Sequence, residues 1–137
     1  MQHPQFHIVD SDDHVRSELR GFVQLAFPSA HIADHSSAER ALEEIELNGA
    51  DLLITGCQMP GMDGPMLVRK LRAQKPALPI IMMSGASDVR TLGEAAGINY
   101  FIEKRYLEID LAGAISRLLK VFGLQEQFPV SFGPVTL

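Results

Sequence analysis

Acidic, hydroxyl and amine side chains follow the ends of short apolar runs in this chain of 137 residues. Asp10, Ser11, Asp12 and Asp13 follow the first run, Gly56 and Cys57 the third, Ser84 the fourth and Lys104 the fifth. Carboxylates in such places can bind a hard cation or cap a following helix, and an ammonium group can pair with a carboxylate. Whether these side chains meet depends on the elements that carry them.

Five short apolar runs alternate with stretches in which apolar residues recur at helical spacing. The runs cover residues 6–10, 30–34, 51–55, 79–83 and 100–103. Their nearly continuous apolar character indicates strands that are covered on both faces. The alternation of strand and helix is typical of a repeated βα unit.

Apolar stripes and end signals predict five helices. The second begins with a capping box from Ser36 to Glu39 and stops at Gly49. The third has Pro65 in its first turn, and the fourth spans about 87–96. The fifth carries an apolar stripe of Leu111, Ile115, Leu118, Leu119 and Phe122.

Strands joined by helices of this length must run parallel with right-handed crossovers, and five such units form an open sheet with helices on both faces. We therefore predict an α/β, flavodoxin-like (βα)5 three-layer sandwich with strand order 2-1-3-4-5. Because ligands gather beyond the carboxyl ends of such strands, the polar side chains there should converge. Residues 1–123 form the predicted domain, and 124–137, with two prolines and no apolar stripe, are expected to be a tail or linker.

Composition and charge exclude several classes of function. The formal charge of −5 and the isoelectric point near 5.4 lack the basic excess of nucleic-acid-binding domains. No apolar run approaches the roughly 20 residues of a membrane span, and the N-terminus carries no secretion signal. The single cysteine, Cys57, cannot form an internal disulfide. We expect a cytoplasmic domain that binds neither nucleic acid nor membrane.

The most specific motif covers residues 51–64 and reads Asp-Leu-Leu-Ile-Thr-Gly-Cys-Gln-Met-Pro-Gly-Met-Asp-Gly. Supporting pieces are Ile-Val-Asp at 8–10, Pro-Ile-Ile-Met-Met-Ser-Gly at 79–85, and Lys104 followed by Tyr106. With these pieces the chain resembles the receiver domains of two-component response regulators, over residues 6–122.

The resemblance implies a phosphorylation pocket. In that family a carboxylate after strand three accepts a phosphoryl group and an acidic pair after strand one holds a divalent cation. A hydroxyl and a lysine after strands four and five stabilise the phosphoryl oxygens. Position by position, the acidic pair falls on Asp10 and Ser11, the acceptor on Gly56, the hydroxyl on Ser84 and the lysine on Lys104.

This sequence departs from the family pattern at three of its positions. Gly56 has no side chain and cannot form an acyl phosphate, and Ser11 removes a carboxylate that would help to hold magnesium. We therefore expect no cofactor, and only Asp10 and Asp12 are candidates for a metal ligand. Arg105 stands where the family has a cis proline, and we expect a trans bond because a cis bond before a non-proline costs about 2.5–4 kcal/mol.

Several residues also have plain structural interpretations. Asp12 and Asp13 precede a helix and are expected to cap it rather than bind metal. Lys104 is expected to pair with Asp10 and to hold the pocket closed without a cation. Ser84 either caps the approach to the fourth helix or keeps a switching role.

Two further sets of polar residues are expected to have no function. His31 and His35 are four residues apart, but they straddle a predicted strand end, so we interpret them as ordinary surface histidines. Cys57 is interpreted as an inert small apolar residue.

We interpret the chain as a degenerate receiver, not an enzyme, that acts as a phosphorylation-independent interaction or regulatory module. The resemblance implies an interaction face on the fourth helix, the fifth strand and the fifth helix. Phe101 stands there in the place of an aromatic residue that swings between exposed and buried positions in the family. The other residues assigned to this face are Arg90, Glu94, Arg105, Tyr106, Glu108 and Arg117. The implied partners are a histidine kinase, a phosphotransfer protein, an output domain or a second copy of the chain.

Two alternatives stay open. The chain could be phosphorylated at a displaced aspartate, Asp10 or Asp12. It could also sense a small molecule on the same fold, in the space left by the missing carboxylate.

Overall fold

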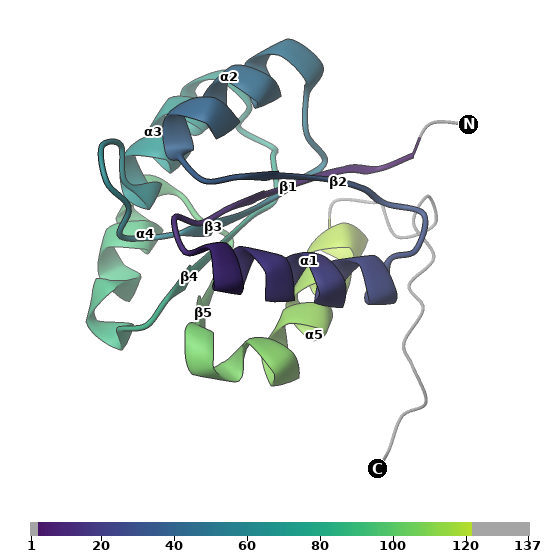
Figure 1. Cartoon of the computed structure of the whole chain (residues 1–137). Coiled ribbons are helices and arrows are strands. Elements are labelled where there is room, and N and C mark those ends of the chain that lie inside the picture. The colour runs from purple at the N-terminus through teal and green to yellow at the C-terminus, as the bar shows by residue number, and fades with distance from the viewer. Residues whose placement is uncertain (1–2, 122–137) are drawn as a thin grey trace.

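The computed structural model describes residues 3–121, which form a sheet between two layers of helices (Figure 1). The predicted tail and Phe122 lie outside the described residues. The elements are β1 (Gln5–Val9), α1 (Asp13–Ala26), β2 (His31–His35), α2 (Ala38–Asn48), β3 (Leu52–Gly56), α3 (Gly64–Gln74), β4 (Ile80–Ser84), α4 (Arg90–Ala96), β5 (Tyr100–Glu103) and α5 (Leu107–Val121). Every predicted strand is found within one residue of its expected bounds. The predicted fourth helix instead begins as a 3-10 turn, η1 (Ser87–Val89), before α4.

The sheet has the predicted topology. All neighbouring strands are parallel and follow the order β2-β1-β3-β4-β5. α1 and α5 cover one face, and α2, α3 and α4 cover the other (Figure 1). Val9 pairs with Thr55, and Gly56 pairs with Met83, so the ends of β1, β3 and β4 meet at one edge.

Alternating side chains of β1 divide the core into two layers. Phe6 and Ile8 are fully buried on the α1 and α5 side, where the Phe6 ring meets that of Phe27 edge to face at 5.5 Å between centroids. Val9 packs in the opposite layer against α2 and α3. Both faces of the sheet are therefore apolar, as the continuous runs predict. Within residues 3–121, no helix is long and apolar enough to cross a membrane.

The predicted capping box is wrong in its register. Ser37, not Ser36, caps α2 by accepting a backbone N–H of the first turn at 3.3 Å. Glu39 bonds away from its own helix, because its Oε2 accepts the backbone N–H of Met62 at 3.2 Å in the loop after β3. Gly61 in this loop has a φ of 77°, which residues with side chains rarely adopt. A tertiary contact of Glu39 thus replaces the local one.

Arg72 of α3 joins three elements by its guanidinium. It donates to the carbonyl of Gly97 after α4 at 2.8 Å, to the carbonyl of Leu78 before β4, and to Asn99 Oδ1 at 2.7 Å. The same Asn99 oxygen accepts the backbone N–H of Ile80 at 2.8 Å. Burial lowers the pKa of Arg72, which nonetheless stays cationic because an arginine titrates far above neutral pH. This clamp fixes the start of β4 and β5.

The interpretation of His35 as an ordinary surface histidine is wrong. His35 is half-buried, and its Nε2 lies 3.0 Å from Nδ1 of His7, which is buried in β1. His31 is exposed, as expected. The difference arises because the parallel register places Val9 beside His35 and so brings the His35 ring diagonally against that of His7.

Candidate functional site

Asp10 is the most constrained polar residue at the carboxyl edge of the sheet. It follows β1 directly and is only 2% exposed. Its Oδ1 accepts the backbone N–H of Asp12 at 2.8 Å, and its carbonyl accepts a hydrogen bond from Arg16 at 2.8 Å. Its Oδ2 lies 2.9 Å from Nζ of Lys104. The predicted pair between Asp10 and Lys104 is therefore confirmed.

The Asp10–Lys104 contact is an ion pair without good hydrogen-bond geometry. Although the two atoms are 2.9 Å apart, Oδ2 of Asp10 has no donor in hydrogen-bonding geometry among the described residues. The Coulomb attraction of the two opposite charges holds the pair together, because it does not depend on the approach angle. The ammonium of Lys104 is the charge that compensates this buried carboxylate.

Gly56 ends β3 directly beside Asp10. A Cβ atom at position 56 would lie 2.8 Å from Oδ2 and 3.4 Å from the carboxyl carbon of Asp10. Such a contact is shorter than real Cβ atoms make, so any side chain at position 56 would force Asp10 to move. The carboxylate of Asp10 thus stands in the space that a side chain of residue 56 would enter.

Ser84 and Ser11 both lie at this edge of the sheet, but they differ in burial and in hydrogen bonding. Ser84 ends β4, is buried, and its Oγ accepts the backbone N–H of Ala86 at 3.1 Å. It therefore orders the turn toward α4, which agrees with the capping interpretation. Ser11 is exposed. The bond between Lys104 and Arg105 is trans, as expected.

Asp12 is the N-cap of α1. Its Oδ1 accepts the backbone N–H groups of His14 at 2.9 Å and Val15 at 3.3 Å. The hydrogen bond from Val15, and then that from His14, lower the pKa of Asp12, because they stabilise the carboxylate form. The predicted capping role is confirmed for Asp12.

The residues at this edge do not fit a magnesium ion. The ion needs several oxygen ligands in near-octahedral geometry. Asp10 is already bound to a backbone N–H and to an ammonium, and Asp12 is committed to the helix cap. Throughout the part of the chain that the structure describes, no group of three or more His, Cys, Asp or Glu residues could hold a metal. At this edge, the carboxylate of Asp10 is therefore engaged in the ion pair with Lys104, and that of Asp12 in the cap of α1.

Cys57 follows Gly56 and is only 4% exposed. Burial, and then the charge of Asp63, raise the pKa of the Cys57 thiol. A thiol of raised pKa is a poor nucleophile, because the thiolate is the reactive form. The interpretation of Cys57 as an inert residue agrees with this environment.

Of the residues assigned to the interaction face, only Phe101 is buried. The Arg90 guanidinium lies over the ring of Phe101 at 5.3 Å from the centroid. Arg105 lies 4.8 Å from the ring centroid of Tyr106 and pairs with Glu103 at 3.0 Å. The remaining assigned residues, Glu94, Glu108 and Arg117, are exposed.

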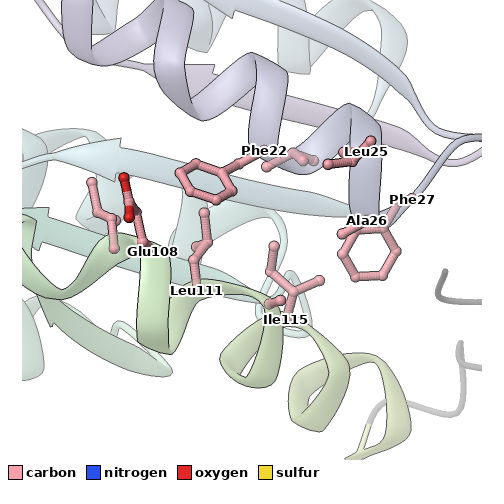
Figure 2. A pocket seen from close by; sticks show the side chains of 10 residues that line it. Phe22, Leu25, Ala26, Phe27, Glu108, Leu111 and Ile115 are labelled. Atoms are coloured by element: carbon pink, nitrogen blue, oxygen red, sulfur yellow. The ribbon is translucent and has the colours of Figure 1, made fainter. Parts of the chain in front are cut away.

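Glu108 lies in the first turn of α5, next to α1. It lines an apolar cavity of about 150 Å³ between α1 and α5. Figure 2 shows Phe22, Leu25, Ala26 and Phe27 of the α1 side facing Glu108, Leu111 and Ile115 of α5. Glu108 therefore borders α1, and its place in the interaction face stays a prediction.

The fold and this edge define a class of signalling domain. Residues 6–116 match the family of response regulator receiver domains. Since the match covers most of the chain, the chain belongs to the receiver domains of two-component signalling. Receiver domains interact with histidine kinases and output domains, and they are generally phosphoryl acceptors rather than enzymes.

Individual relatives agree with this family. The chain is similar to the C4-dicarboxylate transport transcriptional regulatory protein DctD of Rhizobium meliloti, with 33% identity over 86 residues, 63% of this chain and 18% of that protein. It is also similar to the sensor protein EvgS of Escherichia coli, with 31% identity over 123 residues, 88% of this chain and 10% of that protein. The chain thus spans less than a fifth of either relative.

A solved structure agrees with the fold. The signal receiver domain of an HD domain-containing protein from Pseudomonas fluorescens superposes with a TM-score of 0.79. The alignment covers 89% of this chain and 98% of that one, at 23% identity. At this identity the likeness concerns the fold alone.

Proposed function

We propose that this receiver domain does not accept a phosphoryl group and acts instead as a phosphorylation-independent protein–protein interaction module. The observation that carries the proposal is the position of Asp10 over Gly56. No carboxylate is present at the end of β3, and Oδ2 of Asp10 stands within 2.8 Å of the point where a Cβ atom would be. Lys104, whose ammonium would stabilise phosphoryl oxygens in the family, is paired with Asp10.

The interaction face is formed by α4, β5 and the start of α5. Phe101 lies buried beneath Arg90, so the aromatic residue has a cation over its ring that favours this position. Tyr106 is 41% exposed and Leu92 52% exposed, which gives the face apolar contact area between charged residues. The fitting partners are a histidine kinase, a phosphotransfer protein, an output domain or a second copy of the chain.

Phosphorylation can be tested directly. The chain is incubated with acetyl phosphate and magnesium and its intact mass is measured, with beryllofluoride binding followed in parallel by NMR. We expect no mass gain and no magnesium-dependent spectral change. The double variant Gly56→Asp with Ser11→Asp is the positive control, because it restores both the acceptor and the second acidic residue of the family pattern.

A mass gain in the natural chain would contradict the proposal and favour a displaced acceptor. Asp10→Asn and Asp12→Asn then identify the residue, because each removes one candidate carboxylate with little change of shape. A gain that persists in both variants would place the acceptor elsewhere in the chain.

The interaction face can be tested by a charge placed in it. Tyr106→Glu adds a negative charge to this face, between β5 and α5, and should weaken binding to the partner by tenfold or more, about 1.4 kcal/mol. Leu47→Glu is the matched control, because Leu47 is an exposed apolar residue on α2, across the sheet from α5. Titration is performed with candidate kinases and output domains, and by sedimentation for self-association. Equal loss in both variants would contradict this face.

A further inference from the structure

Two histidines on neighbouring strands form a hydrogen-bonded pair under α2. His7 of β1 is 3% exposed, and His35 ends β2. Nδ1 of His7 and Nε2 of His35 lie 3.0 Å apart, and the ring planes are within 9° of parallel. On its other side, Nε2 of His7 lies 3.2 Å from the carbonyl of Gly49, which follows α2.

The hydrogen-bond partners determine the protonation of both neutral rings. A carbonyl oxygen can only accept, so Nε2 of His7 must carry the proton that it donates to Gly49. Nδ1 of a neutral His7 is then unprotonated and accepts from Nε2–H of His35. One directed chain of hydrogen bonds thus joins the end of β2, the middle of β1 and the end of α2.

An added proton acts differently on the two rings. On His7 it would occupy Nδ1, and the hydrogen bond would then require that a neutral His35 carry its proton on Nδ1 and accept at Nε2; with both rings protonated, two N–H groups would face each other and the bond would be lost. His35 could take a proton on Nδ1 without losing its bond, but the charge would lie beside a buried ring. Burial, and then the charge of His35, lower the pKa of His7, and burial lowers the pKa of His35.

Charged groups around the pair oppose one another. Glu44 of α2 and Asp34 of β2 favour a protonated ring, and His31 of β2, Arg40 of α2 and Arg16 of α1 oppose it. Asp51 and Lys75 also line the open cleft beside His7, together with His3. Because both signs are present, these groups do not replace the solvation that burial removes from a charged imidazole.

The pair lies where it can hold the edge strand β2 on the sheet. Within residues 3–121, β2 is an edge strand that pairs with β1 alone. We propose that the His7–His35 pair is a pH-sensitive latch, which holds the end of β2 on β1 while at least one of the two rings is neutral and releases it when both rings are protonated. The inference concerns the opposite edge of the sheet from β5 and is independent of the interaction module.

Hydrogen exchange of backbone amides tests the latch. Protection factors of β2 are measured by NMR between about pH 7.5 and pH 5.5, the range in which histidines titrate, with the central strand β4 as internal reference. In the natural chain, β2 protection should fall by up to about tenfold for each pH unit and each proton taken up. The protection factors of β4 should change less over the same pH range.

The variant His7→Gln should abolish this pH dependence. A glutamine amide can donate to Gly49 and accept from His35, but it does not titrate in this range. His14→Gln is the matched control, because His14 lies exposed on α1 and is not among the charged groups around the pair, and it should leave the pH dependence unchanged. Equal loss in both variants, or β2 protection that does not vary with pH in the natural chain, would overturn the proposal.

Imidazole ¹⁵N shifts of the natural chain provide a second test that needs no variant. At about pH 7.5 they should show His7 protonated on Nε2 only, and the protonation of both rings should coincide with the loss of β2 protection. A doubly protonated His7 at that pH, or protonation of both rings without any change in β2, would refute the latch even if His7→Gln failed to fold.

Discussion

One residue, Asp10, determines the electrostatics of the carboxyl edge. It is buried, and its partners are a backbone N–H and the ammonium of Lys104. A buried carboxylate is stabilised by such a pair only while the partner remains, because desolvation of the remaining charge is unfavourable. With Gly56 in place, no second carboxylate competes for Lys104. The pair can therefore stay closed without a cation.

Lys104→Met should destabilise the domain through the carboxylate it leaves behind. Removing one partner of a buried pair costs about 3–5 kcal/mol, and Lys104 is 30% exposed, so we expect a loss of about 1–3 kcal/mol in the free energy of unfolding. Urea denaturation at neutral pH measures it. Lys70→Met, an exposed lysine on α3, is the control and should change stability little. Asp10→Asn in the Lys104→Met background should recover part of the loss, and no recovery would contradict the explanation.

At the scale of elements, α3 depends on contacts that are distant in sequence. Arg72 reaches Gly97 and Asn99, which are 25 and 27 residues away, and so ties α3 to the start of β5. Since a hydrogen bond to a charged group contributes about 1.5–3 kcal/mol, this side chain is a substantial part of the packing between α3, β4 and β5.

Arg72→Lys keeps the charge but cannot reproduce a planar group that donates in several directions. We expect the free energy of unfolding to fall by about 2 kcal/mol, as measured by urea denaturation. Arg69→Lys, an exposed change on the same helix, should be close to neutral. Equal stability of both variants would show that the hydrogen bonds of Arg72 contribute little to the stability of the domain.

Elements were predictable from the sequence to the extent that local periodicity determines them. The five strands, the parallel order and the cap at Asp12 follow from apolar runs, connection lengths and helix-start signals. The cap of α2 did not, because Glu39 bonds Met62 across the fold. The His7–His35 contact also required the register between β1 and β2, which periodicity does not provide.

The site was predictable only in part, for the same reason. The motif over 51–64 located Gly56, and the strand ends located Asp10 and Lys104, which the structure brings into contact. The sequence could not show that the carboxylate of Asp10 occupies the space above Gly56, because side-chain placement depends on neighbouring elements. The sequence also could not show that Glu108 lines a cavity between α1 and α5, because that depends on how the two helices pack.

At the scale of the whole molecule, the stability of the domain should depend on pH through its buried histidines. The pKa values of His7 and His35 are lowered in the folded chain. In the unfolded chain both return to the ordinary value near 6.5, so the unfolded state binds more protons in mild acid. The contribution of these two histidines to stability is therefore fully present above about pH 6.5. It is lost as the pH falls toward their lowered pKa values in the folded chain.

The free energy of unfolding should accordingly decrease from about pH 7.5 to pH 5.5, with a slope of at most about 1.4 kcal/mol per pH unit for each additional proton that the unfolded chain binds. Urea titrations at several pH values measure this slope. Carboxylates titrate mostly below this window, so they contribute little to it. His7→Gln should flatten the slope, whereas His14→Gln should not, because His14 is exposed on α1 and is not among the charged groups around the buried pair. A slope that is unchanged in His7→Gln would show that the acid sensitivity of the whole domain arises from other groups.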